Sequence, residues 1–508
     1  MHKISQHWSE LDAARTALLQ RAEQYAEWTL PYLFPAANAT VENAELPTAF
    51  GSIGARCVNH LANVITETLF PAGRAFFRVE AGSGIKTTAA AHNIGEATVE
   101  ASMSALERAS MATANPAALK SAHTEVSKLL IVTGNALVFY TKNPRTKQRE
   151  ALVYSMRDYV CVRDPLGTVL TIITRDAVVY GALPKDVQAQ YRATNKDAKD
   201  TDKLRLYTRL TYDRDSDMYT AEQALEDVNL VTEVVAKYSG TACPWRVLTW
   251  HRSRGDNYGR GLVEDYAYTF SAYNAISLSY VTSQATRGDV KRCVDPSSTV
   301  DVETLNKSKP FEWIAAKKDE LWTMEFGHLS DDASVAQYII RQEQLLSQAF
   351  MLTTAAVRDA ERVTAEEIRL MANELEKSHG GIYSKLAAEW QLGLAYILMD
   401  DAGIPASGNF RPKVITGMEA MSRNAEVENL YNVFRDLSIL GVLPPQLQRR
   451  VNEAEFVNFV CASRNVSPNT LFLPDEVVQA QDAQRAQAAK ELADQKAMSD
   501  IAMGATQA

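Results

Sequence analysis

The stretch YAYTFSAYNAISLSYVTSQAT, residues 266–286, holds 21 residues without a charge between Asp265 and Arg287. Aromatic and aliphatic side chains recur along it at helical spacing, which predicts one long helix. This stripe consists of Tyr266, Phe270, Tyr273, Ile276 and Tyr280. The length suggests a membrane span, but nine of the 21 residues are Ser, Thr, Asn or Gln, whereas true spans are predominantly apolar. We expect a helix covered by protein, either in a monomer core or between copies of the chain, which the small polar residues favour.

A second helix is predicted to return beside the first. Residues 289–329 are irregular and charged, and Ser330, Asp331 and Asp332 then provide capping and acidic residues for a helix over 330–350. The helical pattern is lost over 351–363, which predicts a loop. The pattern therefore predicts two paired helices joined by a charged tip.

A capping box, Thr364-Ala365-Glu366-Glu367, starts the next predicted helix. Gly380-Gly381 lies inside this pattern and predicts either a kink or two consecutive helices. Further on, the sequence predicts a short extended piece at PKVITG, a helix over about 419–440, and a polar helical or frayed tail from Val478.

The N-terminal half combines helices with strands. One helix is expected over residues 9–30, and others over 53–69, 94–110 and 116–133. From Ala136 to about residue 256 the pattern alternates as in strands, with turns at 164–167 and 214–217. The predicted fold class is α+β and predominantly helical.

Composition excludes several classes of protein. The 508 residues carry 53 Lys and Arg against 62 Asp and Glu, a net charge of −9, so no overall basic field exists to hold nucleic acid. The five cysteines include no C-x-x-C pair, which argues against a disulfide framework or a zinc site. The first residues lack the apolar segment of a signal peptide, and we expect synthesis in the cytoplasm.

The sequence contains no convincing catalytic motif. Residues 82–87, GSGIKT, lack the spacing of a phosphate loop, and the aspartates at 213, 215 and 217 lack the glycine and glutamate of a calcium loop. The eight histidines never lie three or four residues apart, and no G-x-S-x-G occurs. We therefore expect no enzyme activity, no cofactor and no bound metal.

Several motifs in order resemble the portal, or head-to-tail connector, proteins of short-tailed podophages, and the resemblance covers nearly the whole chain. The motifs are TLPYLFP at 29–35, IGARCVNHLANVITETLFP at 53–71 followed by AFFRV, VRDPLGTVL at 162–170 followed by TRD and GALP, ACP at 242–244, YGRGLVEDY at 258–266, and ERVTAEEIR at 361–369 followed by ELE and GGIYS.

The resemblance implies a ring of twelve copies at one vertex of the capsid, with a central channel through which DNA is packaged and later ejected. It implies a portal fold with wing, stem, clip and crown. The implied parts are the wing at 1–260, a first stem helix at 261–288, the clip at 289–329, a second stem helix at 330–350, a tunnel loop at 351–363, a long helix and more wing at 364–440, and the crown and C-terminal tail at 441–508. The aromatic stripe of residues 266–280 would then pack between subunits of the stem.

The resemblance also implies two sets of contact residues. Arg358 and Arg362 lie in the tunnel loop and would touch DNA phosphates transiently, although they could equally pair with Asp359 or Glu361. A docking patch in the clip, for terminase and later for tail adaptors, would be an exposed aromatic with basic neighbours, unless the tryptophan is buried within a solvated lysine rim. Its residues are Lys307, Lys309, Trp313, Lys317 and Lys318.

The implied partners are other copies of the chain, the terminase large subunit, tail adaptor and tube proteins, scaffolding and major capsid proteins, and internal core proteins. Double-stranded DNA would pass through without sequence preference, no membrane would be involved, and the net acidic chain would offer DNA only weak contacts. The expected location is the portal vertex of the virion, after assembly in the host cytoplasm. The alternatives are another ring- or lattice-forming virion protein, such as a tail tube or shell component, and a soluble enzyme or ATP-driven motor.

Overall fold

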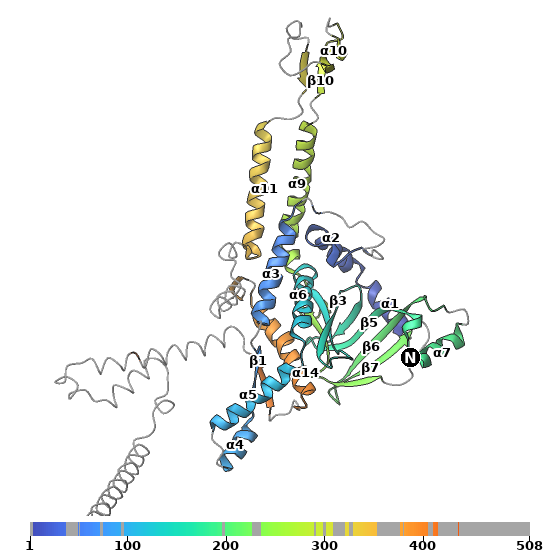
Figure 1. Ribbon diagram of the computed structural model, residues 1–508, viewed down its shortest axis with the longest axis vertical. Coiled ribbons are helices and arrows are strands. Elements are labelled where there is room, and N and C mark those ends of the chain that lie inside the picture. The colour runs from blue at the N-terminus through green and yellow to red at the C-terminus, as the bar shows by residue number, and fades with distance from the viewer. Residues whose placement is uncertain are drawn as a thin grey trace, which may run out of the picture. The chain divides into compact units, whose positions relative to one another are not determined.

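The computed structural model combines helices with antiparallel strands (Figure 1), which confirms the α+β class. The chain divides into two compact units, residues 1–417 and 418–508. The structure describes residues 4–36, 49, 51–71, 75–92, 96–195, 199–225, 235–288, 291–297, 301–307, 321–324, 329–352, 376–378, 380–404, 410–414 and 435. The helix predicted over 419–440 and the C-terminal tail lie outside these residues, apart from Arg435.

The N-terminal segment forms two helices, α1 (Ile4–Ala13) and α2 (Thr16–Trp28), so the prediction of one helix over 9–30 is wrong. The break falls at Arg15, whose side chain turns inward and is only 4% exposed. Its guanidinium donates to the Tyr159 carbonyl at 2.7 Å and lies 5.4 Å from the centre of the Tyr258 ring. A buried guanidinium needs such partners, and contact with them is accompanied by a bend of the chain between the two helices.

Helices predicted over 53–69, 94–110 and 116–133 are confirmed. A short 3-10 turn, η1, follows α2, and four helices lie between residues 53 and 133. Their bounds are η1 (Pro31–Leu33), α3 (Ile53–Leu69), α4 (Ser83–Ala91), α5 (Glu96–Ala112) and α6 (Pro116–Thr133). The Asn115 side chain caps α6 by accepting from the Ala118 amide at 3.4 Å, with Pro116 at the first helical position. Gly134, at φ +76°, ends α6 in the left-handed conformation.

Two antiparallel sheets follow, as the alternating pattern predicts. The first has the order β3-β2-β9 and the second the order β4-β5-β6-β7-β8. The strands are β2 (Asn135–Lys142), β3 (Arg149–Tyr154), β4 (Tyr159–Arg163), β5 (Val169–Val179), β6 (Lys203–Asp213), β7 (Met218–Leu225), β8 (Ala236–Ser239) and β9 (Trp245–Thr249). The predicted turns at 164–167 and 214–217 join β4 to β5 and β6 to β7, so both are confirmed.

Smaller elements complete the described body. The turn η2 (Tyr180–Ala182) and helix α7 (Lys185–Thr194) lie between β5 and β6. Strand β1 (Phe77–Ala81) pairs with β12 (Phe410–Val414), which confirms an extended piece at the start of PKVITG. The double glycine ends a helix, because Gly380 and Gly381 have φ values of +59° and +86°. Consecutive helical segments follow, and they are α13 (Ile382–Leu386), the π-helical turn η4 (Ala387–Gln391) and α14 (Leu392–Asp401).

A buried hydrogen-bonded chain of aromatic side chains joins α6, β2 and η4 in the main core. The Trp390 indole nitrogen donates to the Tyr140 hydroxyl at 2.8 Å, and that hydroxyl lies 3.1 Å from His123 Nε2. Because an indole nitrogen only donates, the Tyr140 hydroxyl accepts from Trp390 and keeps its own hydrogen available for His123 when Nε2 is the unprotonated nitrogen. Burial lowers the pKa of His123 to about 3.

This histidine predicts a loss of stability in acid. The folded-state pKa of His123 lies below the unfolded value of about 6.5, so the unfolded chain binds more protons, and stability falls as the pH drops below about 6.5. We expect His123 to account for about 2 kcal/mol of the stability lost between pH 7.5 and pH 5. Urea unfolding at both pH values, of the natural chain and of His123→Gln, measures this contribution. An equal acid loss in the two proteins would contradict it.

Candidate functional site

Two long helices run side by side and leave the body together (Figure 1), and we call them the helical hairpin. They are α9 (Ala267–Gly288), preceded by the short α8 (Leu262–Asp265), and α11 (Leu329–Ala349). Both helices were predicted, and both are confirmed. No helix within the described residues is long and apolar enough to cross a membrane.

The body end of the helical hairpin is closed by aromatic packing within one chain. The Phe350 ring, just after α11, lies 5.8 Å from the Phe270 ring and 5.9 Å from the Tyr266 ring. One turn further along, the Tyr273 hydroxyl donates to Glu343 Oε1 at 2.8 Å. Burial, and next the hydrogen bond to Glu343, raise the pKa of Tyr273 to about 12. These contacts fix the two helices against each other where they meet the body.

Part of the predicted aromatic stripe therefore packs inside one chain. Phe270 and Tyr273 are 1% and 6% exposed, so the structure assigns these two side chains to packing within the chain. Tyr266, Ile276 and Tyr280 are partly exposed. Contacts of the stripe between copies stay a prediction.

Sequence reasoning missed a second set of apolar side chains on the helical hairpin, which are exposed in the single chain. Six large ones on the helical hairpin are between 39% and 85% exposed. They are Tyr268, Leu278, Val281, Tyr338, Ile340 and Leu345. The signal was a second helical row on α9, through Tyr268, Ala275 and Leu278, which the stronger aromatic stripe obscured. Exposed apolar side chains on both helices are typical of a protein–protein contact surface.

The far end of the helical hairpin carries a small two-stranded tip, of which the structure describes part. Strand β10 (Lys291–Val294) pairs antiparallel with β11 (Leu321–Met324), and α10 (Val302–Lys307) lies between them in sequence. Lys307 forms an exposed ion pair with Glu303 at 2.6 Å. The other predicted docking residues, and both tunnel-loop arginines, lie outside the described residues. These are Lys309, Trp313, Lys317, Lys318, Arg358 and Arg362.

The base of the helical hairpin lies against the body through close backbone contacts at glycines. The Asn135 side chain accepts from the Gly259 amide at 2.7 Å and donates to the Gly259 carbonyl at 2.8 Å. A β-carbon on Gly134 would lie 2.3 Å from the Arg260 carbonyl carbon, and one on Gly261 would lie 2.6 Å from the Ile131 carbonyl oxygen. The end of α6 thus touches the backbone that leads into α8. This close contact leaves no room for a β-carbon at Gly261, which explains the second glycine of the YGRGLVEDY motif.

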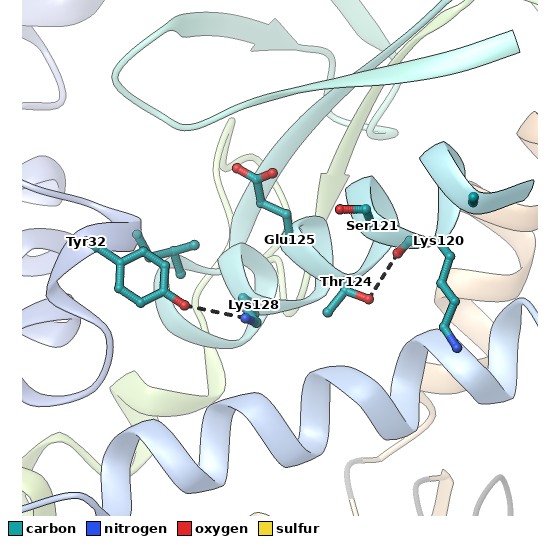
Figure 2. A pocket seen from close by; sticks show the side chains of 8 residues that line it. Tyr32, Lys120, Ser121, Thr124, Glu125 and Lys128 are labelled. Carbon is teal, nitrogen blue, oxygen red and sulfur yellow. Dashed lines mark hydrogen bonds between the residues drawn. The ribbon is translucent and has the colours of Figure 1, made fainter. Parts of the chain in front are cut away.

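An open groove of about 780 Å³ runs along α6 beside η1 (Figure 2). Lys128 Nζ donates to the Tyr32 hydroxyl at 3.4 Å, and Lys120 pairs with Glu67 at 3.5 Å. Both lysines thus have partners on neighbouring elements. The groove is lined by Tyr32, Leu33, Ala117, Lys120, Ser121, Thr124, Glu125 and Lys128. No nucleophile paired with a base is found among these lining residues, and the described part of the chain contains no cluster of three metal-ligating side chains.

Comparisons with known proteins show the family of the chain. A family model described as bacteriophage head to tail connecting protein matches residues 1–405. The portal protein of Enterobacteria phage SP6 is 28% identical over 493 residues, which cover 96% of this chain and 93% of that protein. The portal protein of Pseudomonas phage phiKMV is 29% identical over 500 residues, covering 96% of each. A chain from the neck of an empty GTA particle superposes with a TM-score of 0.36 at 10% identity, covering 79% of this chain and 90% of its own.

The chain belongs to the family of bacteriophage head-to-tail connecting proteins. Its relatives are the portal proteins of podophages, and the portal protein of Escherichia phage T7 is 28% identical over 417 residues, which cover 81% of this chain and 77% of that protein. The role of the chain is therefore that of a portal vertex protein, a part of the virion at the connection of head and tail.

Proposed function

We propose that about twelve copies of the chain close into a ring whose central channel carries double-stranded DNA into the capsid during packaging and out through the tail. The observation that carries the ring is the helical hairpin, because its six exposed apolar side chains need a protein surface to cover them. In this proposal α9 and α11 form the stem, and the residues before α8 form most of the wing. The two-stranded tip belongs to the clip.

The absence of charge over residues 267–286 of α9 supports a channel or a helix contact in the stem. Between Asp265 and Arg287 the helix offers no cation that would hold a phosphate, so DNA could slide past it with few persistent contacts. In the alternative, neighbouring copies cover α9 and other residues face the DNA. Both arrangements require the same closed ring. A tail tube or shell component would form a tube or a lattice instead, so the geometry of the assembly separates these functions.

The partners and contact residues belong to the same proposal. Terminase would dock on the clip during packaging, and tail adaptors would replace it afterwards, through Lys307, Lys309, Trp313, Lys317 and Lys318. Arg358 and Arg362 would touch the DNA phosphates in passing. Scaffolding, major capsid and internal core proteins would surround the ring in the host cytoplasm, where we place its assembly.

Ring closure is tested with Leu278→Glu in α9. We expect native mass spectrometry and negative-stain images to show closed rings of about twelve natural chains, and at least a tenfold smaller ring fraction for the variant. The reason is that a charge buried against a neighbouring helix lacks a partner. The control is Leu166→Glu, the same change at a side chain 88% exposed in the β4–β5 turn.

Normal rings from Leu278→Glu would contradict the proposed interface, and a natural chain that remains monomeric would contradict spontaneous ring closure. In assembled rings, a packaging assay with Arg358→Ala plus Arg362→Ala, and terminase binding with Lys317→Glu plus Lys318→Glu, test the two contact sets. Unchanged packaging or unchanged binding would remove the corresponding residues from the proposal.

A further inference from the structure

A basic loop precedes the helical hairpin, and the proposal above assigns none of its residues to the ring contact or the channel. The loop HRSRGDNYGR, residues 251–260, holds three arginines and one histidine against one aspartate, in a chain whose net charge is −9. His251, Arg254 and Arg260 are exposed. Arg260 lies 3.9 Å from Glu264, whereas Arg254 forms no hydrogen bond or ion pair with any residue that the structure describes.

Two further cations lie beside this loop, and they donate hydrogen bonds to backbone carbonyls without forming an ion pair with a described carboxylate. Arg163, at the end of β4, donates to the carbonyls of Gly167 and Val247 at 2.9 and 3.0 Å. Lys385, in α13, donates to the carbonyls of Thr249 and Trp250 at 2.9 and 3.0 Å. Carbonyl oxygens orient these side chains but leave their net charge in place.

Arg163, Arg252 and Lys385 all lie near Glu389, and His251 and Arg254 stand on the same loop as Arg252. We call these five residues, Arg163, His251, Arg252, Arg254 and Lys385, the basic patch. Arg252 reaches the β4–β5 turn, because a β-carbon on Gly167 would lie 2.4 Å from its Nη2. It also donates to the Asp256 carbonyl at 3.1 Å, which holds the loop in shape.

The nearby acids offset only part of the positive charge of the basic patch. Glu389 interacts with Lys385, Arg163 and Arg252, and Asp256 lies within the loop. Asp164 is already paired with Arg214 at 2.7 Å. A formal excess of positive charge therefore remains on a surface whose backbone is fixed by hydrogen bonds.

We propose that the basic patch binds the phosphodiester backbone of double-stranded DNA, at a place separate from the channel. Guanidinium groups match phosphate oxygens in a planar fork, and a duplex presents one negative charge about every 1.7 Å along its axis. Arg252 and Arg254, two residues apart on the exposed loop, supply the forks, and the cations beneath them add to the field. The proposal rests on the proposed function only because DNA handling brings a duplex to this protein.

The experiment uses closed circular duplex DNA, which cannot thread a channel, and chains whose assembly state has first been measured by native mass spectrometry. We expect gel shifts to show salt-dependent binding by the natural chain. Arg252→Ala plus Arg254→Ala should weaken it about tenfold at 50 mM salt and lower the slope of log K against log salt by roughly two. The matched control is Arg145→Ala plus Lys147→Ala, which removes the same charge from the exposed β2–β3 turn.

An equal loss in both double variants would reduce the effect to overall charge and overturn the proposal. An unchanged affinity in Arg252→Ala plus Arg254→Ala, or no binding of circular DNA by the natural chain, would overturn it as well. If the natural chain bound an acidic polypeptide but not DNA, the basic patch would be assigned to a protein partner, and the proposal would be overturned. Because ring formation is measured separately, failure of the ring leaves this result readable on its own.

Discussion

Gly134→Ala should lower the free energy of unfolding by about 3 kcal/mol or more, a large fraction of the stability of a typical domain. Two effects add. At φ +76° the backbone of residue 134 is left-handed, and an alanine is disfavoured there because its β-carbon comes too close to the following carbonyl oxygen. The new β-carbon would also lie 2.3 Å from the Arg260 carbonyl carbon and 2.4 Å from the Gly261 nitrogen, and backbone atoms cannot rotate away as a side chain can. The end of α6 must then separate from the backbone that leads into α8.

Gly255→Ala is the matched control for this change. Gly255 has φ +89°, yet nothing lies within 4 Å of its missing β-carbon. The control therefore isolates the conformational effect, about 1 kcal/mol, from the backbone clash. Urea unfolding of the natural chain and both variants gives the two values. Equal losses from Gly134→Ala and Gly255→Ala would show that the close approach of α6 to the base of the helical hairpin is unimportant.

Asp401→Ala is expected to lower the free energy of unfolding by about 3–5 kcal/mol. The Asp401 side chain is 3% exposed and accepts from Arg149 through both carboxylate oxygens and from Lys142 Nζ at 2.7 Å. Without the carboxylate, the Arg149 guanidinium, whose side chain is 15% exposed, would keep its charge with only the Tyr140 carbonyl as a described partner. Asp401 also lies at the C-terminal end of α14, where a negative charge is unfavourable, so the two cations compensate it.

The control for Asp401 is Glu67→Ala, which removes an ion pair on the surface of the same body. Glu67 and Lys120 are 39% and 53% exposed and 3.5 Å apart, so we expect a change below about 1 kcal/mol. Thermal unfolding of the three proteins compares the two ion pairs directly. A loss from Asp401→Ala no larger than that from Glu67→Ala would mean that water reaches Arg149 and replaces the carboxylate.

Local patterns predicted the elements well where short-range rules decide. The helical periodicity over 53–69 and 116–133 and the turn residues at 164–167 and 214–217 predicted helices and hairpins at their observed positions. The break between α1 and α2 was missed because it depends on Arg15 meeting Tyr159 and Tyr258, which are more than 140 residues away. The helix propensity of residues 9–30 depends only on that segment and cannot indicate partners so far away in the sequence.

The sequence alone determined the α+β class, the helical hairpin with its charged tip and the resemblance to head-to-tail connectors, because these follow from periodicity, charge spacing and ordered motifs. Only the tertiary structure decided which faces of the helical hairpin are used. It buried Phe270 and Tyr273 inside one chain, left Tyr268 and Leu278 exposed, and brought the end of α6 against the glycines before α8. The physical reason is that periodicity gives the angle of a side chain around its own helix, whereas the neighbour that covers it comes from a distant part of the chain.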